Sequence, residues 1–575
     1  MDEQATEQTP WPLRPILLAA VGVVAAVTVQ QILEAHATDP IVWRVAVSAA
    51  ISTAAMSFGF VAERVRLPWT IAFALIVGAV AGLVTWWSGG PGGSWADIWG
   101  WRGVSLLVAI AITAPLFQTA RDQGSAHFPY PEVLGHVWIN VILWFACWAF
   151  VGIAFALTFL LSELFQLIGL TLLKTLLLRE WFAATLFGAA FGGALGIFRE
   201  RDRIVRTLQR VVTAVLGVLA PVLGVGLAVF LLALPFTGLG ALWAATRSAT
   251  PTLLACVIGA VILANAVIGD GPEDEARNPV LRWGALALAA AMLPLAVIAS
   301  IATGLRIGQY GFTPDRLWAL VFVAVAVAYG VAYWVAIARG RLNWAEKVRP
   351  ANLNLAFGLA GLALFLALPI VSFNAISTRD QVARLQSGKV TPEKFDWAAL
   401  AFDYGAPGKA ALAKLRSSPD PLLRRRAVQA GTAATRWDLV QAVPSRDEAA
   451  KSIRVLPAGS PPLPDALLDT LGRSGCGGND QGGCTVLVTA PGKVIVVRQS
   501  CFGGTFPLVC ENVQALSLAD GQWSIGREVL GRGEPGYAER AAAQQKAYAA
   551  GQVEVRPVQR RQVYVGGVPV GDPFE

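Results

Sequence analysis

Residues 162–178 read SELFQLIGLTLLKTLLL, an apolar run with single polar interruptions, and its interpretation decides the topology of the chain. At about 100° per residue, Glu163, Gln166 and Lys174 fall within one helical arc of about 80°. Leu, Phe and Ile cover the remaining face. A narrow polar arc beside a broad apolar face is typical of a helix that lies in a membrane interface. We therefore predict that 162–178 does not cross a bilayer.

The composition of the whole chain supports a membrane location. Of 575 residues, 55% are hydrophobic and only 15% are charged, and the mean hydropathy is +0.55. Soluble proteins carry roughly 25% charged residues. These values exclude a soluble enzyme, a disordered chain and a fibrous protein. The net charge of +8 fits Lys and Arg retained in cytoplasmic loops, so no nucleic-acid partner is expected.

Long apolar runs fill the first two thirds of the chain. A span needs about 20 mostly apolar residues, because a helix rises about 1.5 Å per residue and the hydrocarbon core is about 30 Å thick. The spans must be helices, since a lone strand would leave its backbone groups without partners in lipid. The runs are 15–33, 41–61, 69–87, 103–120, 137–161, 180–198, 211–234, 251–269, 283–303, 317–337 and 353–373. The predicted fold is mainly α, a polytopic bundle of about 11 transmembrane helices in a lipid bilayer, followed by a C-terminal extramembrane domain.

The distribution of Lys and Arg predicts the orientation. With residues 1–14 inside, the cytoplasmic segments hold fifteen basic residues and the opposite side holds seven. Positive residues favour the cytoplasmic side, so the N-terminus is expected in the cytoplasm. Eleven spans within 15–373 then put everything after residue 373 on the outside. A twelfth span at 162–178 would move five arginines between residues 199 and 210 to the outside.

The tail is predicted to have two parts. Residues 374–457 are helical, with one helix broken by the Gly-Ala-Pro-Gly sequence at 405–408. A Pro-rich linker opens the second part, 458–575, which is β-rich because short apolar and β-branched runs alternate with turn signals. Those runs are CTVLVT, KVIVV, VQALSL and QWSIGREV.

The cysteines indicate that the tail is oxidised. Of six, Cys147 and Cys256 lie within predicted spans and act as small apolar residues. The other four are Cys476, Cys484, Cys501 and Cys510. In a non-cytoplasmic domain they predict two disulfides, with three pairings open. No C-x-x-C and no His occurs in the tail, so we predict neither a metal nor a cofactor.

Three stretches suggest a family. FPYPE (128–132) opens the fifth span, GLRIGQYGFTPDR (304–316) joins the ninth and tenth, and RLQSGKVTPEKFDWAALAFDYG (384–405) follows the last. Together they resemble the bacterial membrane-protein family known as "domain of unknown function" 4153, over about residues 15–430. The resemblance implies a polytopic protein of the bacterial inner membrane and brings no established activity. With the orientation predicted above, the C-terminal domain is then expected in the periplasm. The disulfide domain beyond it looks like an addition of a particular lineage.

Polar residues inside the spans are the usual indication of a transport path, and here they are few. Candidate ligand or helix-bridging positions are Asn140 in the fifth span, Asn265 in the eighth and Asp270 just beyond it. No span carries a mid-bilayer Asp, Glu, Lys or Arg. Hydrogen bonds between helices are therefore the favoured role of the two asparagines.

The loop YGFTPDR is a second candidate region. Thr313 is expected to cap the helix entered through Pro314, with Asp315 near the positive end of its dipole. A rigid entry turn accounts for the pattern, and a ligand role for Arg306, Arg316 or Tyr310 is the alternative.

Glycines four residues apart predict close helix packing. Gly188, Gly192 and Gly196 line one face of the sixth span. Small residues at this spacing let two backbones approach closely, either within the chain or in a homodimer.

No motif for nucleotide hydrolysis occurs, and the tail lacks the His of a Ser-His-Asp site. The leading hypothesis is a non-enzymatic envelope scaffold, sensor or assembly partner whose tail contacts a periplasmic or other envelope protein. A transporter or channel for a small or lipidic solute is the alternative. A lipid-modifying membrane enzyme is a weaker one.

Overall fold

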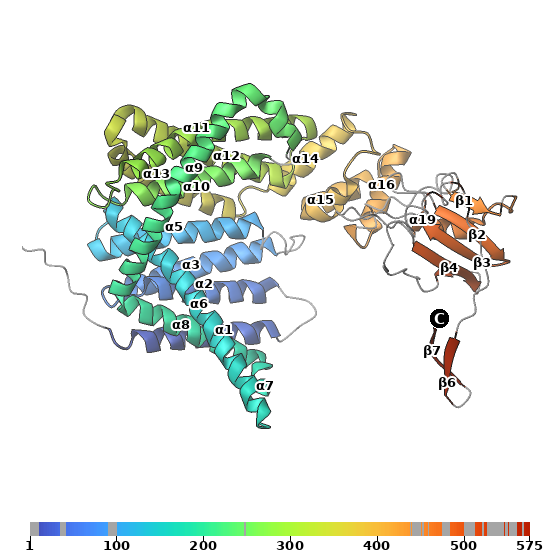
Figure 1. Ribbon diagram of the computed structural model, residues 1–575, viewed down its shortest axis with the longest axis horizontal. Helices are drawn as coiled ribbons and strands as arrows, with labels where there is room; N and C mark the ends of the chain where they lie inside the picture. Colours follow the sequence, from blue (N-terminus) through green and yellow to red (C-terminus); the bar gives the residue numbers. More distant parts are fainter. Residues whose placement is uncertain are drawn as a thin grey trace, which may run out of the picture. The chain divides into compact units, whose positions relative to one another are not determined.

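The computed structural model describes residues 11–34, 42–89, 100–245, 249–436, 453–457, 459–473, 484–498, 512–519, 522–525, 561–565 and 568–574, with the single positions 439, 450, 476, 546, 550 and 552. The chain forms two compact units, Met1–Ser418 and Pro419–Glu575. Figure 1 shows the helices of the first unit and the sheets of the second. The division falls after Ser418, within the segment 374–457 that the sequence suggests as one helical part.

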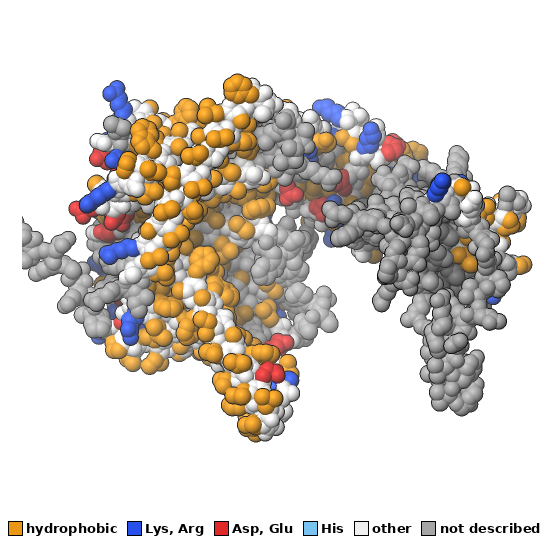
Figure 2. Space-filling view, in the orientation of Figure 1, with side chains coloured by type: hydrophobic (Ala, Val, Ile, Leu, Met, Phe, Trp, Pro, Cys, Tyr) orange, Lys and Arg blue, Asp and Glu red, His pale blue; other side chains and the backbone are white. Residues whose placement is uncertain are grey.

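The first unit is built from long apolar helices. They are α1 (Arg14–Glu34), α2 (Val42–Val61), α3 (Leu67–Ser88), α5 (Trp101–Gln123), α6 (Tyr130–Leu167), α8 (Glu180–Glu200), α9 (Asp202–Ala245), α10 (Ala249–Ile268), α11 (Pro279–Tyr310), α12 (Pro314–Gly340) and α13 (Trp344–Ala367). Within the described ranges, eleven helices are long and apolar enough to cross a membrane, which confirms the predicted number. In Figure 2 hydrophobic side chains cover the visible broad face of these helices, and charged side chains gather along its left edge.

The segment 162–178 does not form a span, but it also differs from the single interfacial helix expected. Residues up to Leu167 continue α6, which has 38 residues and is therefore about 57 Å long. The helix ends where Gly169 adopts φ +81°, and Leu170 N donates to Phe165 O at 2.9 Å. Only the short helix α7 (Leu172–Leu177) follows. The end of α6 and α7 project beyond the other helices of this unit and carry exposed hydrophobic side chains (Figures 1 and 2).

The glycine face of α8 packs against α1. A Cβ on Gly188 would collide with the Gly22 carbonyl, and one on Gly192 would collide with the Leu18 carbonyl. Gly196 lies equally close to Pro15. The close packing that the glycine spacing predicts therefore occurs within the chain, and a homodimer would need another surface.

Two of the hydrophobic cores found among the described residues join most helices of the bundle. One is formed by α9 to α13 and includes Leu288, Met292 and Leu295, which are fully buried. The other joins α1, α2, α6 and α8 around Leu143 and Leu195. Such cores are close-packed, so each fixes the relative positions of its helices.

Arginine side chains cap two helix C-termini. At the end of α2, Arg14 donates to Ala62 O, Arg121 to Val61 O and Arg199 to Phe60 O. At the end of α10, Arg349 Nη2 donates to Ile268 O at 2.6 Å and to Gly271 O at 3.0 Å. A guanidinium satisfies helix carbonyls that would otherwise lack partners, and it faces the negative end of the helix dipole.

After α13, three short elements complete the first unit. They are α14 (Phe373–Gln386), the π-helical turn η2 (Ala399–Asp403) and α15 (Gly405–Leu415). The break between the last two falls at Tyr404 and Gly405, where Gly405 has φ +57°. Ala406, Pro407 and Gly408 then form the first turn of α15, so the Gly-Ala-Pro-Gly sequence starts a helix instead of forming a separate turn. Proline fits there because first-turn N–H groups have no helical partner.

The second unit contains α16 (Pro421–Thr432), α19 (Asp465–Arg473) and two sheets. The larger sheet has the order β1 (Ile453–Leu456), β2 (Cys484–Ala490), β3 (Lys493–Arg498), β4 (Asn512–Ala519), β5 (Gln522–Ile525). Strand β1 is parallel to β2, and the other neighbours are antiparallel. β6 (Arg561–Val565) and β7 (Val568–Phe574) pair separately. The first three runs lie on β2, β3 and β4, and the QWSI part of the fourth forms β5, which confirms a β-rich part. Residues 526–529 of the fourth run lie outside the described residues.

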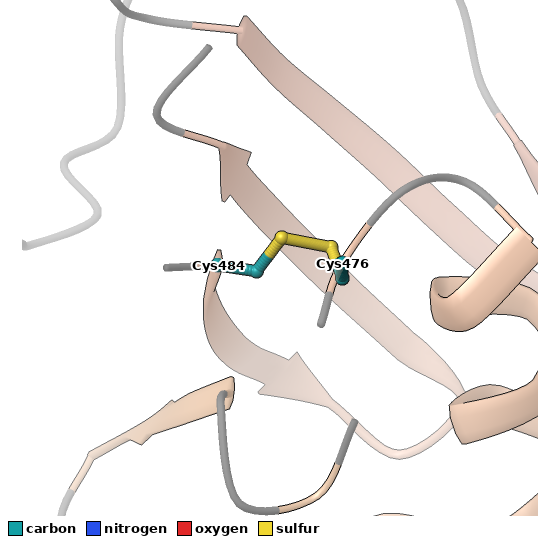
Figure 3. The surroundings of a disulfide bond; sticks show 2 residues. All are labelled: Cys476 and Cys484. Carbon is teal, nitrogen blue, oxygen red and sulfur yellow. A yellow bond between two sulfur atoms is a disulfide. The ribbon is translucent and has the colours of Figure 1, made fainter. Parts of the chain in front are cut away.

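A disulfide joins Cys476 to Cys484 at the start of β2 (Figure 3). Both cysteines are buried in the core of this unit with Val486, Val494 and Leu471. One of the predicted disulfides is thereby present. Cys501 and Cys510 lie outside the described residues.

Candidate functional site

The loop between α11 and α12 is a rigid turn. Gly311 has φ +75° and donates its N–H to Ile307 O at 2.8 Å, which ends α11. Thr313 Oγ1 accepts from Arg316 N at 3.4 Å, and Pro314 opens α12. The predicted Thr313 cap is therefore confirmed. Asp315 lies in the first turn of α12 and is exposed.

Helix α14 binds this turn through its polar face. Asp380 Oδ2 accepts from Phe312 N at 2.8 Å. Gln381 Nε2 donates to the carbonyls of Tyr310 and Phe312, both at 2.9 Å. Arg384 Nη2 donates to Gln309 O at 2.7 Å. We call Gln309–Phe312 together with Asp380, Gln381 and Arg384 the α14 junction.

Cations and aromatic rings surround the α14 junction. The guanidinium carbons of Arg316 and Arg306 lie 5.3 Å and 5.9 Å from the centre of the Tyr310 ring. Burial raises the pKa of Tyr404 to about 12, and nearby Asp396 and Asp403 act in the same direction while Arg316 opposes them. The structure therefore brings Tyr310 and Arg316 into one cluster, as their sequence spacing suggests.

A polar network surrounds Asn265 within the helix bundle. Its Nδ2 donates to Tyr333 of α12 at 2.8 Å, and its Oδ1 accepts from Asn352 of α13 at 2.7 Å. Tyr130, at the start of α6, lies 3.3 Å from both asparagines. We call these four residues the α10 network. It joins four helices by hydrogen bonds, which is the bridging role expected of Asn265.

Asn140 has a separate partner. Its Nδ2 donates to Gln118 Oε1 of α5 at 2.8 Å, and Gln118 Nε2 donates to Phe60 O at the end of α2 at 2.9 Å. Asn140 is therefore also a helix-bridging residue. The structure does not bring Asn140 and Asn265 into one site.

Asp270 lies in the loop after α10, outside the spans. Burial raises the pKa of its carboxyl to about 6, and the hydrogen bond and charge of Asp274 act in the same direction. Arg349 contacts this loop through Gly271 O and lies 3.4 Å from Glu275. The loop thus contains a carboxyl group that titrates near neutral pH.

The chemistry of these sites is mostly that of hydrogen bonding. In the described part of the chain, no three His, Cys, Asp or Glu side chains gather as metal ligands would. The hydrogen-bond partners Gln118, Tyr333, Asn352 and Asp380 were not predicted from the sequence. For two of them a signal was available: Gln118 is a polar residue inside the predicted span 103–120, and Asn352 directly precedes the predicted span 353–373. Polar residues at such positions usually have a partner on another helix. The spacing of 380, 381 and 384 on one helix face was the signal for α14.

These features define the class of the protein. The described ranges contain eleven helices of membrane length, and Figure 2 shows their visible face to be mostly hydrophobic, as in a multi-pass α-helical membrane protein. The chain belongs to the family described as "Domain of unknown function (DUF4153)", whose model matches residues 45–414. The match includes the turn at Tyr310–Arg316, α14 and the FPYPE segment. No curated protein and no solved structure shows significant similarity to the chain.

Proposed function

We propose that this protein is a non-enzymatic scaffold of the bacterial inner membrane, whose bundle anchors an extramembrane domain that binds another envelope protein. The observation that carries the proposal is the α14 junction. Three side chains of α14 bind four backbone atoms of three residues at the α11–α12 turn, so the first element after the last span is fixed to the bundle. In the proposed scaffold, this anchoring gives the extramembrane domain that follows α14 in the chain a fixed point of attachment.

The polar groups of the spans support the same reading. Asn140 and Asn265 each bond to neighbouring helices, and the arginines near helix ends bond to carbonyls. Groups engaged in this way hold helices together. They would have to exchange partners before they could pass a solute.

The proposed location of the second unit is the periplasm, with the N-terminus in the cytoplasm. An odd number of spans puts the two ends of the bundle on opposite sides, and the excess of Lys and Arg favours an inner N-terminus. The disulfide Cys476–Cys484 supports an oxidising compartment.

Photo-crosslinking in living cells tests the scaffold. A benzophenone amino acid placed at Val428, an exposed position of α16, should capture a recurring envelope protein. The D380A/Q381A variant releases the α14 junction and should lower the yield of this product at equal protein level. R379A, at an exposed neighbouring position of α14, is the matched control and should leave the yield unchanged.

A transporter is the second candidate, favoured by one observation. Asn352 Oδ1, within the α10 network, and Arg349 Nε, one turn earlier on α13, are buried without a hydrogen-bond partner among the described residues. If no crosslinked product forms at Val428 and the purified protein moves a solute across vesicle membranes, the scaffold proposal is wrong and the transporter proposal is supported.

A further inference from the structure

Helix α6 leaves the bundle well before it ends. Its residues Leu143, Cys147 and Val151 are buried in the core with α1, α2 and α8. In the stretch 157–178, all of which the structure describes, Ser162 is the one buried residue. We call residues 157–178 the α6 elbow. The rest of the described chain leaves most of the apolar side chains of the elbow uncovered.

The elbow lies beside the bundle, at the depth where neighbouring helices end. Leu177 ends α7, and Glu180 opens α8 three residues later. Glu180 Oε2 accepts from Gln30 Nε2, near the end of α1, at 3.4 Å, so the start of α8 is level with the end of α1. In Figure 1, α6 crosses α1, α2 and α3 obliquely, and α7 lies below them, level with their right-hand ends. The elbow is thus displaced sideways from the bundle.

The length of α6 fits this oblique course. The helix has 38 residues and is about 57 Å long, whereas a whole bilayer with its headgroups measures about 40–45 Å. An upright α6 would carry its apolar end out of the membrane into water. Spans that exceed the bilayer thickness commonly tilt, and a tilted α6 keeps the elbow within the membrane.

The polar side chains of the elbow gather on one side. Lys174 Nζ donates to Gln166 Oε1 at 2.7 Å, which holds α7 against the end of α6. Leu157, Leu161 and Leu164 lie on the opposite side of α6 from Gln166, and all three are exposed. A narrow polar side with a broad apolar one suits a position at the boundary between acyl chains and headgroups.

This apolar side continues a stripe of the span itself. Phe150, Ile153, Leu157, Leu161 and Leu164 follow one another on α6 at intervals of three and four, and all are exposed. The first two lie well inside the predicted span 137–161, where hydrocarbon surrounds the outer face of a bundle. No charged residue lies on the stripe, so the environment that fits the span also fits the elbow.

We propose that the α6 elbow is embedded in the leaflet on the side of α14, with Leu157, Leu161 and Leu164 among the acyl chains. Four spans separate the end of α6 from the α11–α12 turn, and an even number puts the elbow and the α14 junction at the same membrane face. The elbow is then a lateral anchor in lipid. It requires no protein partner and no particular orientation of the chain, so the inference goes beyond the proposed scaffold.

Spin-label accessibility of the full-length protein in liposomes of phosphatidylethanolamine and phosphatidylglycerol tests the proposal. Cys147, Cys256, Cys501 and Cys510 are replaced by alanine, and each variant carries one new labelled cysteine. The elbow positions are L161C and L164C. V222C, at an exposed position in the middle of α9, is the reference for lipid, and R64C, at an exposed position in the loop after α2, is the reference for water.

Labels at L161C and L164C should collide with oxygen as often as the label at V222C does. Their collisions with nickel ethylenediaminediacetate should be about tenfold rarer than at R64C, because transfer of a polar complex into hydrocarbon is costly. E163C is the matched neighbour, on the polar side of the same turn, and should meet the nickel complex more often than L164C does.

Two outcomes overturn the proposal. Nickel collisions at L161C and L164C as frequent as at R64C would put the elbow in water. Rare collisions with both reagents would mean that protein covers the elbow, either a second copy of the chain or an envelope partner. Neither outcome bears on the crosslinking at Val428, so a failure here is distinguishable from a failure of the scaffold.

Discussion

Gly311 is the residue on which the α14 junction depends most directly. Its φ of +75° and ψ of −174° belong to a region that side chains other than glycine rarely occupy. A Cβ there would also collide with Asp380 Oδ2. We expect G311A to lower the free energy of unfolding by about 1–3 kcal/mol and to expose α14 to protease. Thermal unfolding in detergent and limited proteolysis measure these effects.

Gly308 supplies the control for this prediction. It lies one turn earlier in α11, and a Cβ there would meet nothing within 4 Å. G308A should be neutral or slightly stabilising, because alanine favours the helix by about 1 kcal/mol. Equal proteolysis of G308A and G311A would contradict the role given to the junction.

Asp270 should make stability depend on pH. Its folded-state pKa of about 6 lies above the ordinary value of 3.8, so the folded protein binds more protons than the unfolded chain between these values. The contribution is fully present below the unfolded pKa and is lost as the pH rises through the folded pKa. D270N stays neutral and should be more stable than the wild type above pH 6, by about 1 kcal/mol because solvent screens a half-exposed group.

Unfolding temperatures of the two proteins between pH 4 and pH 8 check this sign. E273Q, which neutralises an exposed carboxylate of the same loop, is the control and should leave the pH profile unchanged. A D270N profile parallel to that of the wild type would mean that Asp270 does not titrate near neutral pH.

At the scale of elements, the packing of α1 on α8 shows what spacing predicts and what it leaves open. The interval of four between Gly188 and Gly192 correctly predicted close contact, because small residues permit it whatever the partner. The partner itself, α1, is more than 150 residues away in sequence, and no local pattern identified it. The same holds for α14, whose Asp380 lies 68 residues from Phe312.

Gly192 and Gly193 allow a matched test of this packing. A Cβ on Gly192 would collide with Leu18 O, whereas one on Gly193 would lie 3.8 Å from the Ala19 Cβ. G192A should destabilise the protein by about 1–3 kcal/mol, and G193A should have little effect. Thermal unfolding compares the variants, and light scattering gives their mass. A halved mass for G192A would instead place this glycine in a homodimer interface.

The α10 network should behave as a coupled set of hydrogen bonds. Asn265 Oδ1 accepts from Asn352 Nδ2 at 2.7 Å, so N265A and N352A should be less than additive in a double-mutant cycle. The expected coupling is about 0.6–2 kcal/mol, the range of polar pairs between membrane helices. Unfolding in lipid-detergent micelles measures it, with Asn140 and Asn265, which lie in separate sites, as an additive control pair. Additivity of N265A and N352A would contradict a bridging role.

For the molecule as a whole, the number of spans was predictable from the sequence, but the lengths of the helices beyond the spans were not. Length and hydropathy identify a span, because both follow from the thickness of the hydrocarbon core. The end of α6 is different, since nothing in residues 162–167 breaks a helix and α6 continues through them to Leu167, shortly before Gly169. An amphipathic arc identifies a polar face, but it carries no information on the length of the helix.

Placement of the tail is the prediction on which the proposed function depends. We would replace Cys147, Cys256, Cys501 and Cys510 by alanine and introduce L518C, an exposed position on β4, while the buried pair Cys476–Cys484 stays oxidised. A membrane-impermeant maleimide should label L518C in intact spheroplasts, because eleven spans and the proposed inner N-terminus would put β4 outside. The matched variant R64C, in the loop after α2, should be labelled only after permeabilisation. The reverse pattern would put the tail in the cytoplasm, and the scaffold would then have to find its partner there.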